Sequence, residues 1–183
     1  AMTVGMLTGC GGGDNGTNST GEAPAQEVTV AIASTFATLD PALISTTHMA
    51  HVYGNMGSNF YRTDADGVLQ YDLGEKVEKS EDGLTYTFTI KDGLKWSDGE
   101  ALTAEHFVYG LKRAIGYGPD NAYTKKNLVN FIAGAEEAAN AAMDVADMTN
   151  VGVVALDNTS FQVTLSTPCP FFERIFSGNV TAP

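Results

Sequence analysis

The side chains best suited to chemistry are two histidines and a run of acids, and both sets suggest metal binding. His48 and His51 are three residues apart, so one helix face could present both as ligands. Without a third ligand, they are better interpreted as helix-surface histidines. Residues 64–75 place acids at the first, third and twelfth positions of a calcium loop, but Val68 and Leu69 stand where an oxygen ligand and a glycine are needed. The sequence therefore predicts no metal site.

The sequence contains no recognisable catalytic motif. It has no nucleophile-elbow pattern, no glycine loop for phosphate and no cysteine–histidine zinc set. The carboxylates are numerous, yet none has a partner at a spacing that defines an acid–base pair. Cys169 lies between Pro168 and Pro170 with only the distant Arg174 to lower its pKa, so we expect a buried, inert thiol. We predict no enzymatic activity and no cofactor.

Cys10 points to a different chemistry, the attachment of lipid. Residues 1–10 are a short apolar run that ends at this cysteine, and residues 11–27 are rich in small polar residues. Residues 7–10, Leu-Thr-Gly-Cys, resemble the bacterial lipobox, in which the cysteine sulfur receives a diacylglyceryl group. The run is too short to span a membrane, so we interpret it as the remnant of a signal peptide. The segment after it is expected to be a flexible tether.

The composition excludes several kinds of partner. The 183 residues carry a formal net charge of −12, and 43% of them are hydrophobic. No basic stripe is available to displace counterions from phosphates, so nucleic-acid binding is not expected. The same charge disfavours adsorption of the protein body to anionic lipid. The apolar fraction suffices for a sizeable core, and two cysteines far apart provide no disulfide framework.

Alternation of apolar and polar residues predicts the strands that must carry any site. Residues 28–33 alternate, as do residues 84–90, where a threonine face should be exposed. Residues 151–156 and 160–165 flank Asp157-Asn158 and predict a hairpin. Four Asp-Gly pairs predict an antiparallel meander because both residues tolerate positive φ, and they lie at 66–67, 82–83, 92–93 and 98–99. Trp96 lies among them and is expected to be a packing anchor, although it could also stack on a ligand.

Helical spacing predicts the remaining elements. Residues 46–59 should form a helix whose buried stripe is Met49, Val52, Tyr53, Met56 and Phe60. Thr103 should cap a helix with an apolar face that extends from Ala104 to Ile115. Residues 125–146 should be helical with a break near Gly134, and a short helix should begin after Pro170. The apolar residues before Pro183 are expected to have nothing left to pack against.

Three blocks follow one another in a fixed order. The first is Thr-Leu-Asp-Pro at 38–41, the second covers 73–109 and includes Lys-Trp-Ser-Asp-Gly at 95–99, and the third covers 151–168. In order and spacing these blocks resemble the extracellular solute-binding proteins of peptide ABC transporters. The resemblance covers nearly everything from residue 28 to residue 170.

The resemblance implies part of a periplasmic-binding-protein-like α/β fold, in which two lobes close on a peptide. It assigns residues 28–45 to the start of lobe I, 46–164 to an inserted small α+β subdomain and 165–183 to a return to lobe I. The second lobe would follow Pro183, so the chain is expected to be an N-terminal fragment. Main-chain groups that hold the peptide are expected at Thr35, Phe36, Ala37 and Thr38.

The function implied is that of a receptor, a monomer held by lipid at Cys10 on the extracellular or periplasmic side of the cell membrane. It would capture oligopeptides and deliver them to an ABC transporter permease. The same fold could instead bind dipeptides, nickel complexes, haem or signalling peptides. A surface-tethered enzyme or an adhesion module, with its active part outside this chain, is the alternative from another class.

Overall fold

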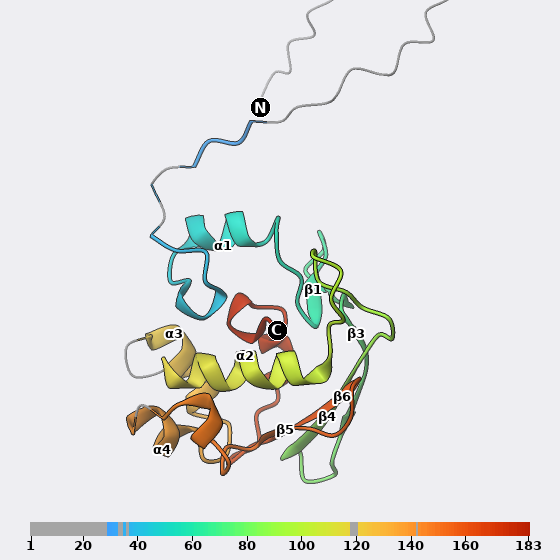
Figure 1. Cartoon of the computed structure of the whole chain (residues 1–183), viewed down its shortest axis with the longest axis vertical. Helices are drawn as coiled ribbons and strands as arrows, with labels where there is room; N and C mark the ends of the chain where they lie inside the picture. The colour runs from blue at the N-terminus through green and yellow to red at the C-terminus, as the bar shows by residue number, and fades with distance from the viewer. Residues whose placement is uncertain (1–28, 33–34, 36, 118–120, 142) are drawn as a thin grey trace, which may run out of the picture. The chain divides into compact units, whose positions relative to one another are not determined.

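The computed structural model describes residues 29–32, 35, 37–117, 121–141 and 143–183 (Figure 1). The chain divides into two units, Ala1–Ala31 and Ile32–Pro183. In the first unit, the described residues 29–31 form neither helix nor strand. All described helices and strands belong to the second unit.

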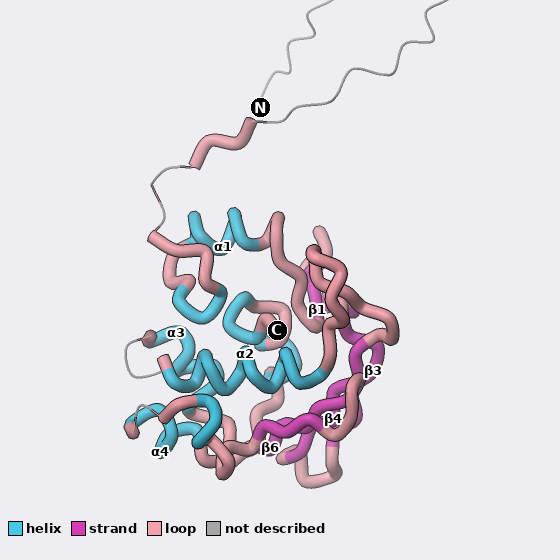
Figure 2. Tube along the Cα trace, viewed as in Figure 1, coloured by secondary structure: helices cyan, strands magenta, loops and turns pink. Residues whose placement is uncertain are grey.

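The second unit is built on an antiparallel sheet of four strands, drawn in magenta in Figure 2 together with a separate hairpin. The order of the sheet is β3-β4-β6-β5, and its strands are β3 (Gly74–Lys79), β4 (Thr85–Ile90), β5 (Val153–Ala155) and β6 (Ser160–Thr164). In the centre, Phe88 of β4 is opposite Val77 of β3 and Phe161 of β6. The hairpin pairs β1 (Tyr61–Thr63) with β2 (Leu69–Tyr71).

The longest helix, α2 (Ala104–Gly116), links the sheet to the shorter helices. It contacts β5 and β6, and also η1, η4, α4, η2 and η3. As the sequence predicts, it begins after Thr103, whose main-chain N–H donates a hydrogen bond to His106 Nδ1 at 3.0 Å. The other helices are η1 (Pro41–Leu43), α1 (Thr47–Tyr53), α3 (Ala122–Thr124), η2 (Lys125–Val129), α4 (Ala135–Asn140), η3 (Val145–Asp147), α5 (Phe172–Ile175) and η4 (Asn179–Thr181).

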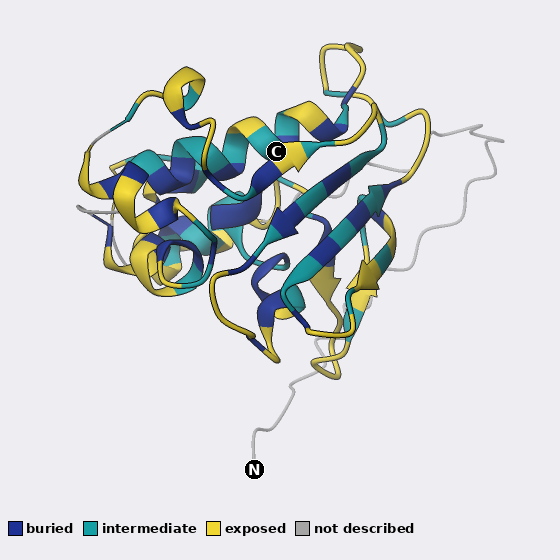
Figure 3. Ribbon diagram, turned by 90° about the horizontal axis from the view of Figure 1, so that it is seen from below, coloured by how far each residue is buried: buried dark blue, intermediate teal, exposed yellow. Residues whose placement is uncertain are grey.

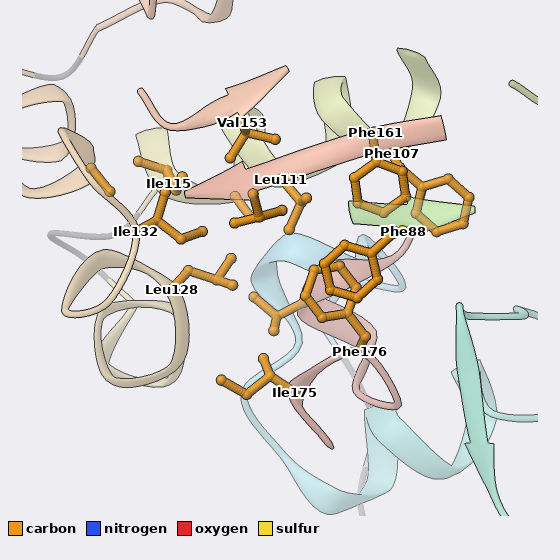
Figure 4. Packing of buried hydrophobic residues seen from close by; sticks show 14 of the residues in the cluster. Phe88, Phe107, Leu111, Ile115, Leu128, Ile132, Val153, Phe161, Ile175 and Phe176 are labelled. Atoms are coloured by element: carbon orange, nitrogen blue, oxygen red, sulfur yellow. The ribbon is translucent and has the colours of Figure 1, made fainter. Parts of the chain in front are cut away.

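The core lies between the sheet and α2 and is rich in phenylalanine rings (Figure 4). Phe88 stacks on Phe161 at 5.0 Å and on Phe176 at 4.2 Å, and Phe107 of α2 stacks on Phe161 at 5.2 Å, all between ring centroids. Buried and half-buried residues alternate along β4 (Figure 3). The threonines of β4 are half-buried, contrary to the exposed face that the sequence predicts, because β4 is a central strand with a neighbour on each side.

Three further expectations about local structure are wrong. Within the expected strand at residues 28–33, the described residues 29–32 form no strand, and Val30 is 77% exposed. The helix expected over 46–59 ends at Tyr53, followed by Gly54, so Met56 is 71% exposed instead of buried. The apolar residues before Pro183 do find packing partners, because Phe176 lies in the core and Val180 is buried.

Gly134 provides the expected break in the region 125–146, and its replacement should be costly. It separates η2 from α4 with φ +72, and an added Cβ would lie 2.4 Å from the main-chain oxygen of Asn150. We expect Gly134→Ala to lower the free energy of unfolding by at least about 2 kcal/mol, because the left-handed conformation and the close contact both penalise a side chain. Urea unfolding measures the loss.

Gly67→Ala is the matched control for this prediction. Its φ is +79, but an added Cβ would meet nothing within 4 Å. The control therefore isolates the cost of the left-handed backbone, about 1 kcal/mol. Equal losses for the two variants would contradict the role assigned to the contact with Asn150.

Candidate functional site

An extended connection between η1 and α1 borders a pocket of about 300 Å³. Its walls are Ile44, Ser45, Thr46, Thr47, Ala50, His51, Tyr123 and Asn179. Ile44 (φ −65, ψ 117) and Thr46 (φ −124, ψ 152) are extended, and Ser45 is exposed. Within the described part of the chain, the main-chain N–H and C=O groups of Ile44 and Ser45 have no hydrogen-bond partner. Extended backbone with free donors and acceptors is what strand-like pairing with a peptide requires.

Two asparagines fix the walls of this pocket. Asn121 is buried, and its side-chain oxygen accepts hydrogen bonds from the N–H groups of Tyr123 at 3.0 Å and Thr124 at 3.3 Å. Its amide nitrogen donates to the main-chain oxygen of Ala42 at 2.8 Å. Asn179 donates to the oxygen of Pro41, also at 2.8 Å. The pocket is therefore assembled from three separate segments by buried or half-buried amides, and Tyr123 presents its phenol at the rim with 45% of its surface exposed.

The turn before the extended connection is held by Asp40 and Arg113. Asp40 Oδ1 accepts hydrogen bonds from Arg113 Nη1 at 2.8 Å and from the Ala42 N–H at 3.0 Å, and its other oxygen pairs with Arg113 Nη2. The N–H of Asp40 donates to the Thr38 hydroxyl at 3.0 Å. The hydrogen bond from Arg113 lowers the pKa of Asp40, and the carboxylate raises the pKa of Arg113. Because Arg113 binds both carboxylate oxygens, the pairing fixes the orientation of the Asp40 side chain as well as neutralising its charge.

Asp40 should give the protein a pH-dependent stability. Because its folded-state pKa is lowered, its contribution is present above its unfolded pKa of about 3.9 and is lost as the pH falls through the folded value. We expect Asp40→Asn to cost about 1–2 kcal/mol at neutral pH and progressively less in acid. Urea unfolding at a series of pH values measures this difference.

The pair Lys76–Glu78 provides a control for the Asp40 prediction. Its side chains are 60% and 62% exposed, so Glu78→Gln should change the stability by less than about 0.5 kcal/mol at any pH. An Asp40→Asn variant with a loss that does not shrink in acid would contradict a role for the ionised carboxylate.

A second cleft, of about 460 Å³, is lined in part by Leu39 and Pro41. Its lining includes the apolar side chains of Tyr53, Met56, Trp96 and Leu102. Trp96 is half-buried, packs against the core and stands edge-on to His106 with 5.4 Å between ring centroids. The predicted packing role of Trp96 is confirmed, and the same ring also forms part of this cleft. We take the smaller pocket as the candidate site because the extended, unpaired main chain of Ile44 and Ser45 borders it.

The residues singled out in the sequence have different outcomes. Thr35 and Ala37 are exposed, Thr38 is half-buried, and Phe36 and Cys10 lie outside the described residues. A binding role for Thr35–Thr38 and lipidation of Cys10 therefore remain predictions. In the parts of the chain that are described, no group of three or more potential metal ligands exists, and no helix is both long and apolar enough to cross a membrane.

Two structural interpretations are confirmed. Asp64 closes the turn at Asp66-Gly67, since its carboxylate accepts hydrogen bonds from the N–H groups of Asp66 and Val68, and Gly67 has φ +79. Cys169 is a buried free thiol, and this burial raises its pKa. Such a thiol is poorly ionised and unsuited to nucleophilic attack.

Comparison with known proteins identifies relatives along most of the chain. The model of the bacterial extracellular solute-binding proteins, family 5 Middle, matches residues 68–183. A dipeptide-binding protein of Lactococcus lactis subsp. cremoris is 34% identical over 160 residues, which are 86% of this chain and 28% of the relative. The oligopeptide-binding protein OppA of Bacillus subtilis is 33% identical over 173 residues, or 93% of this chain and 31% of the relative.

The structure has counterparts among solved proteins as well. The crystal structure of a periplasmic oligopeptide-binding protein from Borrelia burgdorferi matches with a TM-score of 0.71 and 27% sequence identity. That match covers 80% of this chain and 29% of the other. The chain thus spans less than a third of the length of each of these relatives.

Proposed function

Since the chain belongs to the bacterial extracellular solute-binding proteins of family 5, we propose that it is part of a receptor that captures oligopeptides for uptake by an ABC transporter. The observation that carries the choice of ligand is the extended, unpaired main chain of Ile44 and Ser45 beside the pocket. Hydrogen bonds to a peptide backbone hold it without reading its side chains, which suits the uptake of mixed peptides. The names of the Lactococcus and Bacillus relatives support the same ligand class.

The peptide-contacting stretch begins at the predicted segment Thr35–Thr38 and continues to Thr47. The Asp40–Arg113 pair lies between its two parts and holds the turn that joins them. Tyr123 faces the second part across the pocket and supplies a hydroxyl that can donate to a peptide carbonyl. No bond in the ligand is broken, so affinity and closure of two lobes constitute the mechanism.

The location and partners follow from the same proposal. Lipid attached to Cys10 holds the receptor on the extracellular or periplasmic side of the cell membrane, and a tether over residues 11–27 lets the monomer reach the permease. An acidic body suits this arrangement, because it does not adhere to anionic headgroups while it collects ligand.

Calorimetry on the full-length protein tests the ligand class. We expect micromolar or tighter binding of short peptides with different side chains, and no binding of free amino acids. Tyr123→Ala should weaken peptide binding, whereas Tyr109→Ala, at an exposed tyrosine outside this pocket, should not. Binding of haem or of a nickel complex in place of peptides would favour another solute, and hydrolysis of the peptide would overturn the receptor proposal.

Residues 1–183 expressed alone should bind peptide weakly or not at all. Sites that enclose a ligand need walls on both sides, and this chain holds less than a third of the length of its relatives. Titration of the fragment next to the full-length protein measures the difference. A micromolar calorimetric signal from the fragment would show that one wall suffices.

A further inference from the structure

The four Asp-Gly turns of this chain differ in how firmly their reactive groups are held. All four glycines have positive φ, between +69 and +95. An aspartate followed by glycine is the pair most prone to isomerise, because the glycine amide nitrogen can reach the aspartate carboxyl carbon without hindrance from a side chain. What separates the four pairs is therefore whether hydrogen bonds occupy the attacking nitrogen and the carboxylate.

In three of the pairs, the glycine N–H is bound within the turn. Gly67 donates to the main-chain oxygen of Asp64 at 3.1 Å, Gly83 to that of Ser80 at 2.9 Å, and Gly99 to that of Trp96 at 3.0 Å. Two of the carboxylates are also occupied. Asp82 Oδ1 accepts from the Ser80 hydroxyl at 2.5 Å and the Leu84 N–H at 3.0 Å, and Asp98 Oδ1 accepts from the Glu100 N–H at 3.0 Å.

The pair Asp92–Gly93 has neither restraint. Both residues are exposed, and among the described residues neither the Asp92 carboxylate nor the Gly93 N–H has a hydrogen-bond partner. A Cβ built on Gly93 would meet nothing within 4 Å, so the space around the nitrogen is open. Asp66–Gly67 is intermediate, since its carboxylate is unbound but its glycine N–H is occupied.

We propose that Asp92–Gly93 is a modification site at which aspartate converts spontaneously to isoaspartate. The Gly93 nitrogen attacks Cγ of the protonated Asp92 side chain, a C–N bond forms and one water leaves, which gives a five-membered succinimide. A water molecule then adds at the main-chain carbonyl carbon of the ring and breaks its bond to the Gly93 nitrogen. The net reaction leaves the mass unchanged, moves the peptide bond to the side-chain carbon and frees the former main-chain carboxyl group.

The place of this turn gives the isomerisation a structural consequence. On one side, the Lys91 N–H donates to the oxygen of Leu73 at 3.0 Å; on the other, Leu94 accepts from the Leu102 N–H at 3.0 Å. Isomerisation inserts one extra carbon into the main chain between these two fixed points. It should therefore loosen the bridge Lys95–Ala101, which flanks Trp96 at the larger cleft.

Ageing of the purified full-length protein at neutral pH and physiological temperature tests the proposal. The ageing is carried out in heavy-oxygen water, so that hydrolysis of the succinimide incorporates the label. Peptide mapping by mass spectrometry after different times then quantifies isoaspartate at each of the four sites. We expect Asp92 to isomerise several times faster than Asp82 and Asp98, with Asp66 between them. Asp92→Glu should abolish the signal at this site, because glutamate would need a less favourable six-membered ring.

Ageing in denaturant separates the effect of the structure from that of the local sequence. Unfolding removes the hydrogen bonds that protect the other pairs, so the four rates should converge. Rates at Asp82 or Asp98 that match Asp92 in the folded protein would overturn the proposal. So would an advantage of Asp92 that persists unchanged in denaturant, since the folded turn would then not be its cause.

Discussion

Replacement of Phe88 by alanine should destabilise the protein by about 3–5 kcal/mol, a large part of the stability of an ordinary domain. Phe88 is fully buried on the central strand β4, where its ring stacks on Phe161 and Phe176 and meets the edge of Phe60. The sheet and helix around it are fixed by hydrogen bonds, so the cavity cannot collapse completely. Denaturant unfolding, monitored by the fluorescence of Trp96, measures the loss.

Phe171→Ala is the matched control for this prediction. The ring of Phe171 is 54% exposed, and its one aromatic neighbour within the described residues is Phe131, edge-on at 5.7 Å between centroids. Its removal should cost less than about 1 kcal/mol, as is usual for surface positions. If Phe88→Ala cost no more than Phe171→Ala, the aromatic cluster would not be the centre of the core.

The inward face of β4 could be predicted because alternation is a local property of the chain. Tyr86, Phe88 and Ile90 are all buried, and the four Asp-Gly pairs all form turns with positive φ at glycine. The break at Gly134 could be predicted for the same reason. The order of three sequence blocks predicts part of a mixed helix-and-sheet binding-protein fold. This prediction is confirmed, and the chain covers 29% of the solved structure that it matches.

Errors arose where the outcome depends on partners distant in the sequence. Alternation at residues 28–33 predicts a strand, but residues 29–32 do not form one. A strand also needs a neighbouring strand to pair with, and alternation does not show whether one is present. The helical spacing of apolar residues continues to Met56, but the helix ends at Tyr53 because Gly54 caps it. The domain boundaries at 45 and 164 remain predictions.

The candidate site could be predicted only in part. The turn at Asp40-Pro41 was visible in the sequence, but its partner Arg113 is 73 residues away, and no spacing rule connects the two. Asn121 donates a hydrogen bond to Ala42, 79 residues away, and its side-chain oxygen accepts one from the Tyr123 N–H. These two bonds bring Tyr123 to the pocket. The one available signal was Thr46, a helix-capping residue five positions after a proline, which implies an extended connection at Ile44 and Ser45.

Replacement of Cys10 by serine should move the full-length protein from the membrane fraction to the soluble fraction. Serine has no sulfur to receive the diacylglyceryl group, so the acyl chains that would hold the protein at the membrane are not attached. The net charge of −12 on residues 1–183 gives this part of the protein no attraction to anionic lipid. Cell fractionation and incorporation of a labelled fatty acid measure the change, which should be nearly complete because stable anchoring depends on the attached acyl chains.

Cys169→Ala is the control, because it removes the second cysteine without touching the proposed anchor. Cys169 is buried and its pKa is raised, so neither acylation nor membrane attachment should change in this variant. Peptide binding by the Cys10→Ser protein should also be unaffected, since the proposed peptide contacts lie at residues 35–47 and at Tyr123. Retention of Cys10→Ser in the membrane fraction at the level of the unmodified protein would refute the lipid anchor while leaving the peptide-receptor proposal in place.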